Sequence, residues 1–232
     1  MSLENLAIIT ARGGSKRIPG KNYQPFCGKL ILYYSIDAAL ASWVFAEVMV
    51  STDDEHIADL ARARGAVVPF MRSAETAGDF ATTDEVILEV LRAYEQRGRS
   101  FGAFCCIYPT APFLTPERLR EAMALLKEAD SVMPVVPFSY PPQRGLQIDG
   151  NGYIRRTHPE YAQVRSQDLE PMYHDCGQFY ACRTSVFLAE KTTDVERLVP
   201  LLLTEMEVQD IDTLADWEIA ELKYKRGLAT IR

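Results

Sequence analysis

The sequence contains few histidines and no Cys-x-x-Cys pair, which argues against the commonest metal sites. Its three histidines, His56, His158 and His174, are far apart, and none lies at ligand spacing from another or from a cysteine pair. None of the five cysteines forms a Cys-x-x-Cys pair, and an odd number of cysteines indicates reduced thiols. We therefore expect neither a zinc site nor a disulfide framework.

Long apolar runs and an excess of positive charge are also missing. No stretch of about 18 apolar residues occurs, and the segment MSLENL does not have the pattern of a secretory signal, so we expect a cytoplasmic protein without a membrane span. The net charge of −7 disfavours a nucleic-acid partner, which requires a basic surface. The 232 residues, 47% of them hydrophobic, are expected to form one principal domain over residues 1–232.

Apolar segments of strand length alternate with segments of helical periodicity. Strands are predicted at 6–10, 46–51, 66–70, 102–108, 130–136 and 177–183, and helices at 30–42, 54–65, 83–98, 116–129 and 213–227. Such apolar strands, separated by helices, predict an α/β fold with a Rossmann-like, mostly parallel sheet and helices on both faces. Residues 138–176 are instead rich in Pro, Gly, Tyr and Arg and contain a predicted hairpin turn, DGNG, so we expect an excursion from the sheet.

The segment ARGGSKRIPGKN, residues 11–22, follows the first predicted strand and contains four cations, three glycines and no acidic residue. It is not a Walker A loop, because Ser15 stands where the first glycine belongs and Asn22 replaces the hydroxyl residue. It also lacks the dinucleotide fingerprint, because Gly13 and Gly14 are adjacent. Glycines and cations at the carboxyl end of a first strand predict an anion site that fits a triphosphate. The alternative is a solvated basic loop.

Two carboxylates, Asp210 and Asp212, lie two residues apart in the segment QDID. In an extended chain both side chains face the same side. This arrangement suits a Mg²⁺ ion held by carboxylates and by phosphate oxygens of a substrate. Alternatively, Asp212 or Thr213 caps the last predicted helix. The segment permits both roles.

These segments together resemble the CMP-sialic acid synthetases, the cytidylyltransferases that activate nonulosonic acids. IITARGGSKRIPGKN resembles the family pattern of an apolar strand followed by A-R-x-x-S-K-x-x-x-x-K-N. VSTDDEHIADLARARGA, MRSAETAGDFATT, PTAPFL and QDIDTLADWEIAE follow in the family's order, so the resemblance covers nearly the whole chain.

Within this family the chain is most similar to the pseudaminic acid cytidylyltransferases, through CIYPTAPFL, RSQDLEPMYHDCGQFYACR and VQDIDTLADWEIAEL. Tyr108 replaces a glutamine of the sialate enzymes, and His174 and Asp175 stand where those enzymes carry a second arginine. Because these positions contact the sugar acid in the family, a different sugar is expected. Pro109 departs from this group, in which alanine is more usual.

The resemblance implies transfer of CMP from CTP to the anomeric hydroxyl of pseudaminic acid, with release of pyrophosphate. Legionaminic acid, N-acetylneuraminic acid or Kdo is the alternative acceptor, and a non-catalytic regulatory protein that binds CTP or a CMP-sugar is the alternative of another class. The resemblance further implies a nucleotide-diphospho-sugar transferase fold, a Mg²⁺ cofactor, a homodimer, and a role in making a glycosylated flagellin or a surface polysaccharide. The excursion at 138–176 resembles the family's dimerisation element, and a lid over its own site is the alternative.

The resemblance also implies roles for individual residues. Those for the nucleotide are Ala11, Arg12, Gly13, Gly14, Ser15, Lys16, Lys21, Asn22, Arg72 and Thr82; Arg12 and Lys21 join Asp210 and Asp212 as the catalytic set, the two aspartates also holding the metal. Those for the sugar acid are Tyr108, Arg165, His174, Asp175 and Gln178, with the planar Arg165 guanidinium on the carboxylate. If the excursion dimerises, Arg165 or His174 completes the neighbour's site. Simpler roles remain open: a surface position for Arg72, a helix cap for Thr83 more than for Thr82, and packing for Tyr108 and Gln178.

Overall fold

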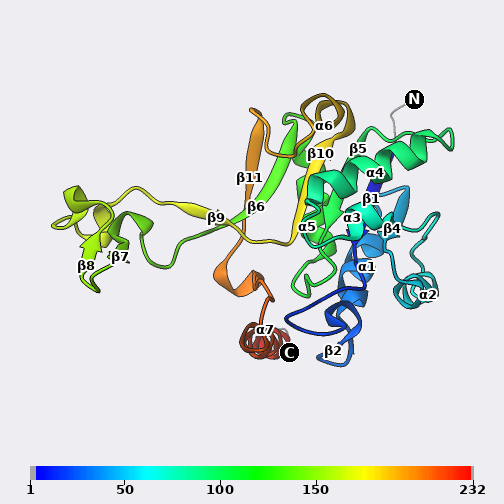
Figure 1. Cartoon of the computed structure of the whole chain (residues 1–232). Coiled ribbons are helices and arrows are strands. Elements are labelled where there is room, and N and C mark those ends of the chain that lie inside the picture. The colour runs from blue at the N-terminus through cyan, green and yellow to red at the C-terminus, as the bar shows by residue number, and fades with distance from the viewer. Residues whose placement is uncertain (1–3, 231–232) are drawn as a thin grey trace.

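A seven-stranded sheet forms the centre of the molecule (Figure 1). The computed structural model describes residues 4–230, with the backbone alone for residues 228–230. The strands follow the order β11-β6-β10-β5-β1-β4, and β9 pairs with β6. Their bounds are β1 Asn5–Thr10, β4 Glu47–Ser51, β5 Ala103–Ile107, β6 Ser131–Pro137, β9 Tyr173–Asp175, β10 Phe179–Arg183 and β11 Leu198–Leu202. The helices are α1 Ile31–Ser42, α2 Glu55–Ala63, α3 Ala74–Ala77, α4 Thr83–Glu95, α5 Pro116–Leu125, α6 Thr184–Glu190 and α7 Leu214–Thr230.

The strand directions make the sheet mostly parallel. Strand β1 pairs in parallel with both β4 and β5, and β11 pairs in parallel with β6. Strand β10 lies antiparallel between β5 and β6, and β9 is antiparallel to β6. The predicted Rossmann-like α/β fold is therefore confirmed, with two strands running against the rest.

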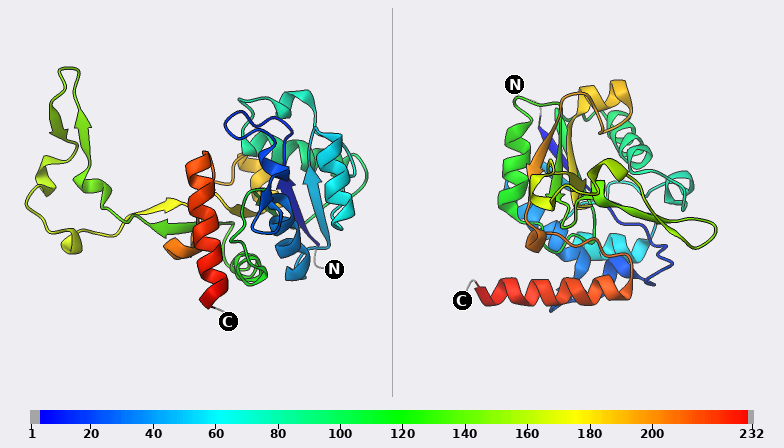
Figure 2. Two further views of the ribbon diagram at one scale, coloured as in Figure 1. Left: turned by 90° about the horizontal axis from the view of Figure 1, so that it is seen from below. Right: turned by 90° about the vertical axis from the view of Figure 1, so that its left-hand side faces the viewer.

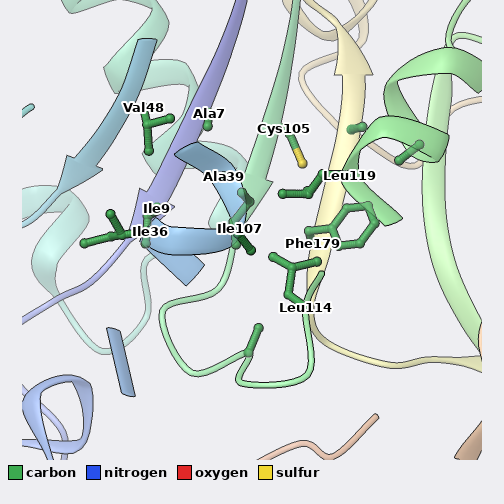
Figure 3. Packing of buried hydrophobic residues seen from close by; sticks show 14 of the residues in the cluster. Ala7, Ile9, Ile36, Ala39, Val48, Cys105, Ile107, Leu114, Leu119 and Phe179 are labelled. Atoms are coloured by element: carbon green, nitrogen blue, oxygen red, sulfur yellow. The ribbon is translucent and has the colours of Figure 1, made fainter. Parts of the chain in front are cut away.

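Successive side chains of the central strands enter different cores, as the period of two in a strand requires. Ala7 and Ile9 of β1 belong to the cluster formed with α1, α2 and α5, part of which is shown in Figure 3. Leu6 and Ile8 belong to the opposite cluster, which contains buried residues of α4 together with Phe187 of α6. Helices on both faces are thus confirmed, and this double burial explains why β1 is apolar along its whole length.

The predicted strand at 66–70 was wrong. Val67 alone forms an isolated parallel bridge with Met49 of β4, through the bonds Val67 N–H to Val48 O and Val50 N–H to Val67 O, both 2.9 Å. Gly65 before it has a φ of +99°, and Pro69 after it has no N–H to donate to a ladder. The bridge therefore cannot extend into a strand.

Several elements were not predicted: the short helices α3 and α6, and the strands β9 and β11. Strand β11 contains Pro200, which lowers the expectation of a strand. It lies at the edge of the sheet, where a missing N–H leaves no neighbouring strand unpaired.

Residues 138–172 leave the body of the molecule, and Figure 2 (left) shows them reaching far beyond it. The predicted DGNG turn joins the antiparallel strands β7 (Leu146–Ile148) and β8 (Ile154–Arg156). Gly152 has a φ of +83° in this turn. The chain returns to the sheet at β9, so the excursion ends a few residues before the predicted position 176.

Within residues 4–230, none of the helices combines the length and the apolar character needed to cross a membrane. The five cysteines are all free thiols.

Candidate active site

A cleft of about 740 Å³ opens at the carboxyl ends of β1 and β5. Four segments provide most of its lining: the loop after β1, the rim segment (residues 78–81) with the first residues of α4, residues 108–110 after β5, and the aspartates before α7. Arg72 and Thr76 complete it. From β1 the chain first adds β4 on one side and later β5 on the other, so the strand order reverses at this point. Open α/β sheets bind ligands at such a reversal.

The predicted loop cations converge on this cleft. Arg12 donates to Asp79 Oδ1 at 3.0 Å, and Lys16 is ion-paired with the same carboxylate. Lys21 donates to the carbonyl of Ile211 at 2.7 Å. Burial lowers the pKa of Lys21, and the charges of Asp212 and Asp210 only partly oppose this effect. The positively charged side chains of the loop therefore all line the cleft.

The loop after β1 is held against the start of α2. The amide of Gly13 donates to Asp53 Oδ1 at 2.9 Å, and Asp54 caps α2 by accepting from the amides of His56 and Ile57 at 2.8 and 3.2 Å. A side chain at position 13 would place its Cβ 2.7 Å from Asp54 Oδ2, so only glycine fits there.

Asn22 ties the two ends of the loop together. Its side-chain amide donates to the carbonyl of Arg12 at 2.8 Å, and the residue is only 6% exposed. Its Oδ1 atom is buried at the cleft wall without a hydrogen-bond partner in the described part of the chain. A buried acceptor of this kind favours a ligand that brings a donor.

Asp210 and Asp212 both line the cleft, so the prediction that they face the same side is consistent with the structure. Thr213 and Asp216 cap α7 instead: Thr213 Oγ1 accepts from the Asp216 amide at 3.3 Å, and Asp216 accepts from the Thr213 amide at 2.7 Å. Asp212 is thus left to the site, where it accepts from Arg17 at 2.8 Å. Burial, and then the charge of Asp212, raise the pKa of Asp210.

The donor chemistry around these aspartates fits magnesium better than zinc. Across residues 4–230 no three or more His, Cys, Asp or Glu side chains cluster in a way that could hold a metal alone. Mg²⁺ is usually bound by one or two carboxylates that share it with substrate phosphates and water. Two carboxylates facing a cationic cleft provide that type of site.

Arg72 is not the surface residue that the alternative interpretation assumed. It is 8% exposed, and its guanidinium donates to Ser51 Oγ at 3.0 Å and to the Ser51 carbonyl at 2.7 Å. Burial lowers its pKa, with the charge of Asp53 opposing. The Ser51 contacts hold the guanidinium in one orientation beside the cleft.

Thr82 caps α4, so the expectation that Thr83 was the better candidate for this cap was wrong. Thr82 Oγ1 accepts from the Glu85 amide at 3.2 Å, and the Glu85 carboxylate accepts from the Thr82 amide at 2.7 Å, which completes a capping box. Thr83 instead shares a hydrogen bond of 3.1 Å with the hydroxyl of Tyr108. Thr82, Thr83 and Tyr108 therefore all lie at this part of the cleft rim.

Of the residues predicted for the sugar acid, Tyr108 alone lines the cleft. Its ring meets that of Tyr180 edge to face at 5.8 Å, and Tyr180 donates its hydroxyl to Asp175. Gln178 is 3% exposed and donates to the Glu207 carbonyl at 2.5 Å, a packing role. Burial raises the pKa of Tyr108.

Arg165 and His174 do not line this cleft. Arg165 is exposed and is paired with Asp168 at 2.9 Å. It belongs to the excursion, which projects away from the central sheet in Figure 1. His174 packs on Phe138 with ring centroids 4.7 Å apart. Asp175 and Gln178 are likewise outside the cleft lining of the chain that carries them.

The structure also adds residues that the sequence did not single out: Asp79, Phe80, Thr83, Thr110 and, as a partner of Asp212, Arg17. Asp79 and Phe80 lie within the segment MRSAETAGDFATT, but neither their residue types nor their spacing indicated a role. Arg17 is one of the four cations of the basic segment, but the sequence indicates no individual role for it.

Comparison with known proteins identifies the family. The family model described as cytidylyltransferase matches residues 6–212. The pseudaminic acid cytidylyltransferase of Campylobacter jejuni subsp. jejuni is 36% identical over 225 residues, covering 96% of this chain and 97% of the relative. The chain belongs to the cytidylyltransferase family.

Other relatives agree with this assignment. The CMP-N,N'-diacetyllegionaminic acid synthase of Legionella pneumophila subsp. pneumophila is 37% identical to this cytidylyltransferase over 224 residues, covering 93% of the chain and 94% of the relative. A solved CMP:2-keto-3-deoxy-manno-octonic acid synthetase complexed with CTP has the same fold, with a TM-score of 0.70 at 17% identity over 97% of this chain and 99% of that one. This cytidylyltransferase is thus a nucleotidyltransferase enzyme, and none of these relatives supports the alternative of a non-catalytic regulatory protein.

Proposed function

We propose that this cytidylyltransferase transfers CMP from CTP to the anomeric hydroxyl of pseudaminic acid in the cytoplasm, as a homodimer that requires Mg²⁺. The observation that carries the proposal is the convergence of Arg12, Lys16, Lys21 and the two aspartates on one cleft at the reversal of strand order. The choice of sugar is supported by the relatives named for pseudaminic acid and by Tyr108 at the rim.

In the proposed reaction the hydroxyl oxygen of the sugar forms a bond to the α-phosphorus of CTP. The bond from that phosphorus to the bridging oxygen of the β-phosphate breaks, pyrophosphate leaves, and the hydroxyl proton is released. Such a transfer depends mainly on positioning and on neutralisation of charge. We assign this task to Arg12, Lys16 and Lys21, with Gly14 and Ser15 around the phosphates. Ala11 and Gly13, which the resemblance also implied, lie outside the cleft lining, and their amides donate to the Ser51 carbonyl and to Asp53 instead.

Asp210 and Asp212 are the residues that would hold Mg²⁺. The ion supplies charge neutralisation on the phosphate oxygens when it is bound. Arg17 and Lys21 contact Asp212 at 2.8 and 3.8 Å, so these cations orient the carboxylate from the loop side.

For recognition of the nucleoside we propose the guanidinium of Arg72 on the carbonyl oxygen of the base, Thr82 near the ribose, and the unpartnered oxygen of Asn22 as an acceptor for a ribose hydroxyl. The donors of Arg72 suit a carbonyl oxygen. The Asn22 oxygen is buried at the wall of the cleft and has no partner among the described residues, which favours a donor on the ligand.

For the sugar acid we propose Tyr108 from the chain that forms the cleft. Asp175 would position Tyr108 indirectly, through the hydroxyl and ring of Tyr180, and Gln178 would do so through packing. Arg165 and His174 would come from the partner protomer, because both are exposed and outside the cleft lining. The single domain over residues 1–232, with residues 138–176 as a dimerisation excursion, belongs to this proposal.

The test is release of pyrophosphate from CTP and Mg²⁺ with pseudaminic, legionaminic and N-acetylneuraminic acid and Kdo supplied separately. We expect turnover with pseudaminic acid and little with the others. Lys21→Met serves as the negative control, because it removes a proposed phosphate cation. Turnover with another acid alone would refute the sugar assignment and retain the reaction, whereas no turnover with any acid, despite CTP binding, would refute the reaction on these substrates.

A further inference from the structure

The rim segment, residues 78–81, contains the carboxylate of Asp79, which forms ion pairs with two of the loop cations. Arg12 donates to Asp79 Oδ1 at 3.0 Å and to the Gly78 carbonyl at 3.4 Å. Lys16 is paired with Asp79 Oδ2. Each carboxylate oxygen therefore faces a different cation, as two oxygens of one phosphate group would.

The segment is anchored at both ends by contacts that do not involve the loop. On the α3 side, Glu89 of α4 accepts from the amide and the hydroxyl of Ser73 at 2.8 and 2.9 Å. On the α4 side, the segment ends at the capping box of Thr82 and Glu85. Between these anchors Phe80 is 99% exposed, so little packing holds the segment in place.

Among the residues that the structure describes, the bonds that this segment makes across the cleft all involve Arg12 and Lys16. The hydrogen bond from Lys16, and secondly that from Arg12, lower the pKa of Asp79, so this carboxylate is charged at neutral pH. Two cations proposed to bind phosphate are thus already paired with an anion that belongs to the protein.

We propose that Asp79 is an internal competitor for the phosphate groups of the nucleotide. Binding of a triphosphate must first separate Asp79 from Arg12 and Lys16, so the observed affinity equals the intrinsic affinity multiplied by the fraction of unpaired molecules. Re-pairing after the reaction takes the cations back from pyrophosphate and favours its release. The proposal rests on the proposed function in one respect, which is that Arg12 and Lys16 bind phosphate.

The test is calorimetric titration of the full-length protein and its Asp79→Asn variant with CTP, with inorganic tripolyphosphate and with cytidine. We expect the variant to bind CTP and tripolyphosphate about 3- to 10-fold more tightly, since it removes two partly exposed ion pairs. Cytidine, which has no phosphate, should bind both proteins equally. Pyrophosphate should also inhibit the variant more strongly than the parent protein.

The matched control is Glu75→Gln, which removes one negative charge from α3, where the Glu75 carboxylate makes no ion pair within the described residues. An equal gain in phosphate affinity from Glu75→Gln would overturn the proposal, because general charge and not pairing would then be the cause. Unchanged tripolyphosphate affinity in Asp79→Asn would overturn it as well. Should that variant not fold, as judged by circular dichroism, Asp79→Ser replaces it.

Failure of the proposed function has a different result. Suppose that CTP gives turnover with none of the sugar acids, but that the Asp79→Asn variant binds tripolyphosphate more tightly than the parent protein does. The competitor role of Asp79 is then supported and the proposed reaction is refuted. If turnover occurs and phosphate affinities are unchanged, the reaction stands and the competitor role does not.

Discussion

At the scale of single residues, two adjacent glycines of the loop after β1 have different tasks. A Cβ built at Gly13 lies 2.7 Å from Asp54 Oδ2 and 2.9 Å from Asp54 Cβ, whereas one built at Gly14 meets nothing within 4 Å. Asp54 cannot retreat without leaving the amides that it caps at the start of α2. The sequence shows two equivalent glycines, and the contact with α2 distinguishes them.

We predict that Gly13→Ala lowers the free energy of unfolding by about 1–3 kcal/mol, through overpacking against Asp54 and loss of its cap. Gly14→Ala is the matched control and should change stability by less than about 0.5 kcal/mol, because the added methyl group has space. Urea unfolding at neutral pH measures both. Equal destabilisation by the two substitutions would show that the loop does not pack on α2 as described.

At the scale of elements, Asp37 of α1 links its helix to two neighbours. Arg64, at the end of α2, donates to both carboxylate oxygens at 2.6 and 2.8 Å, and Lys29 of β3 (Lys29–Leu30) is paired with one of them. Burial alone would raise the pKa of Asp37, but the hydrogen bonds from Arg64 and Lys29 outweigh it and hold that pKa below its usual value. The helix positions thus depend partly on one ionised carboxylate.

The sign of the pH effect follows from this lowered pKa. The contribution of Asp37 is fully present above the pKa of an unfolded aspartate and is lost as pH falls through the lower value in the folded state. We predict that Asp37→Asn costs about 1 kcal/mol of unfolding free energy at pH 7 and that the difference from the parent shrinks below about pH 4. Urea unfolding of both proteins at pH 7 and at several pH values below 4 measures it.

Asp59→Asn is the control for this experiment, because Asp59 forms an exposed pair with Arg62 at 3.0 Å on one helix. Such a pair contributes little, so we expect almost no change at any pH. A pH-independent loss in Asp37→Asn would mean that packing, and not charge, causes the effect.

At the scale of the whole molecule, the excursion exposes an apolar surface that its own chain leaves uncovered. Leu146, Ile148, Tyr153 and Ile154 on the β7–β8 hairpin are between 57% and 76% exposed. An exposed patch on a protruding hairpin is typical of a protein interface. We therefore expect the hairpin to contact a second copy of the chain and to carry Arg165 toward the partner's cleft.

This arrangement predicts complementation between two inactive variants. Lys21→Met damages the cleft, and Arg165→Ala removes the guanidinium that the resemblance assigns to the sugar carboxylate. If Arg165 acts in the partner's cleft, each mixed dimer retains one intact site, and random mixing should restore about a quarter of the parent activity. If Arg165 acts on its own chain, mixing restores nothing. Ile148→Asp, which places a charge on the hairpin, should shift the dimer toward monomer in sedimentation analysis.

How far the sequence predicts this protein depends on whether the determining contacts are local. The periods of two and 3.6 located the sheet strands β1, β4, β5, β6 and β10 and five of the helices, because burial of alternate side chains leaves a direct pattern. The segment 66–70 has the same apolar composition but makes a single bridge, because Gly65 and Pro69 limit it. The periodicity does not indicate the direction of a strand within the sheet. Residues 179–183 were predicted as a strand, but their antiparallel position between β5 and β6 was not predicted.

The sequence by itself determined the alternation of strands and helices, the glycine-rich cationic loop after β1, and the pair Asp210 and Asp212 on one side of the chain. Each follows from residues within a few positions of one another. The tertiary structure decided that Asp79 faces Arg12 and Lys16, 67 and 63 positions away, that Arg17 meets Asp212, and that Thr82 and Thr213 take the helix caps. These contacts join segments distant in the chain, and they form only where the edge of the sheet brings loop ends together.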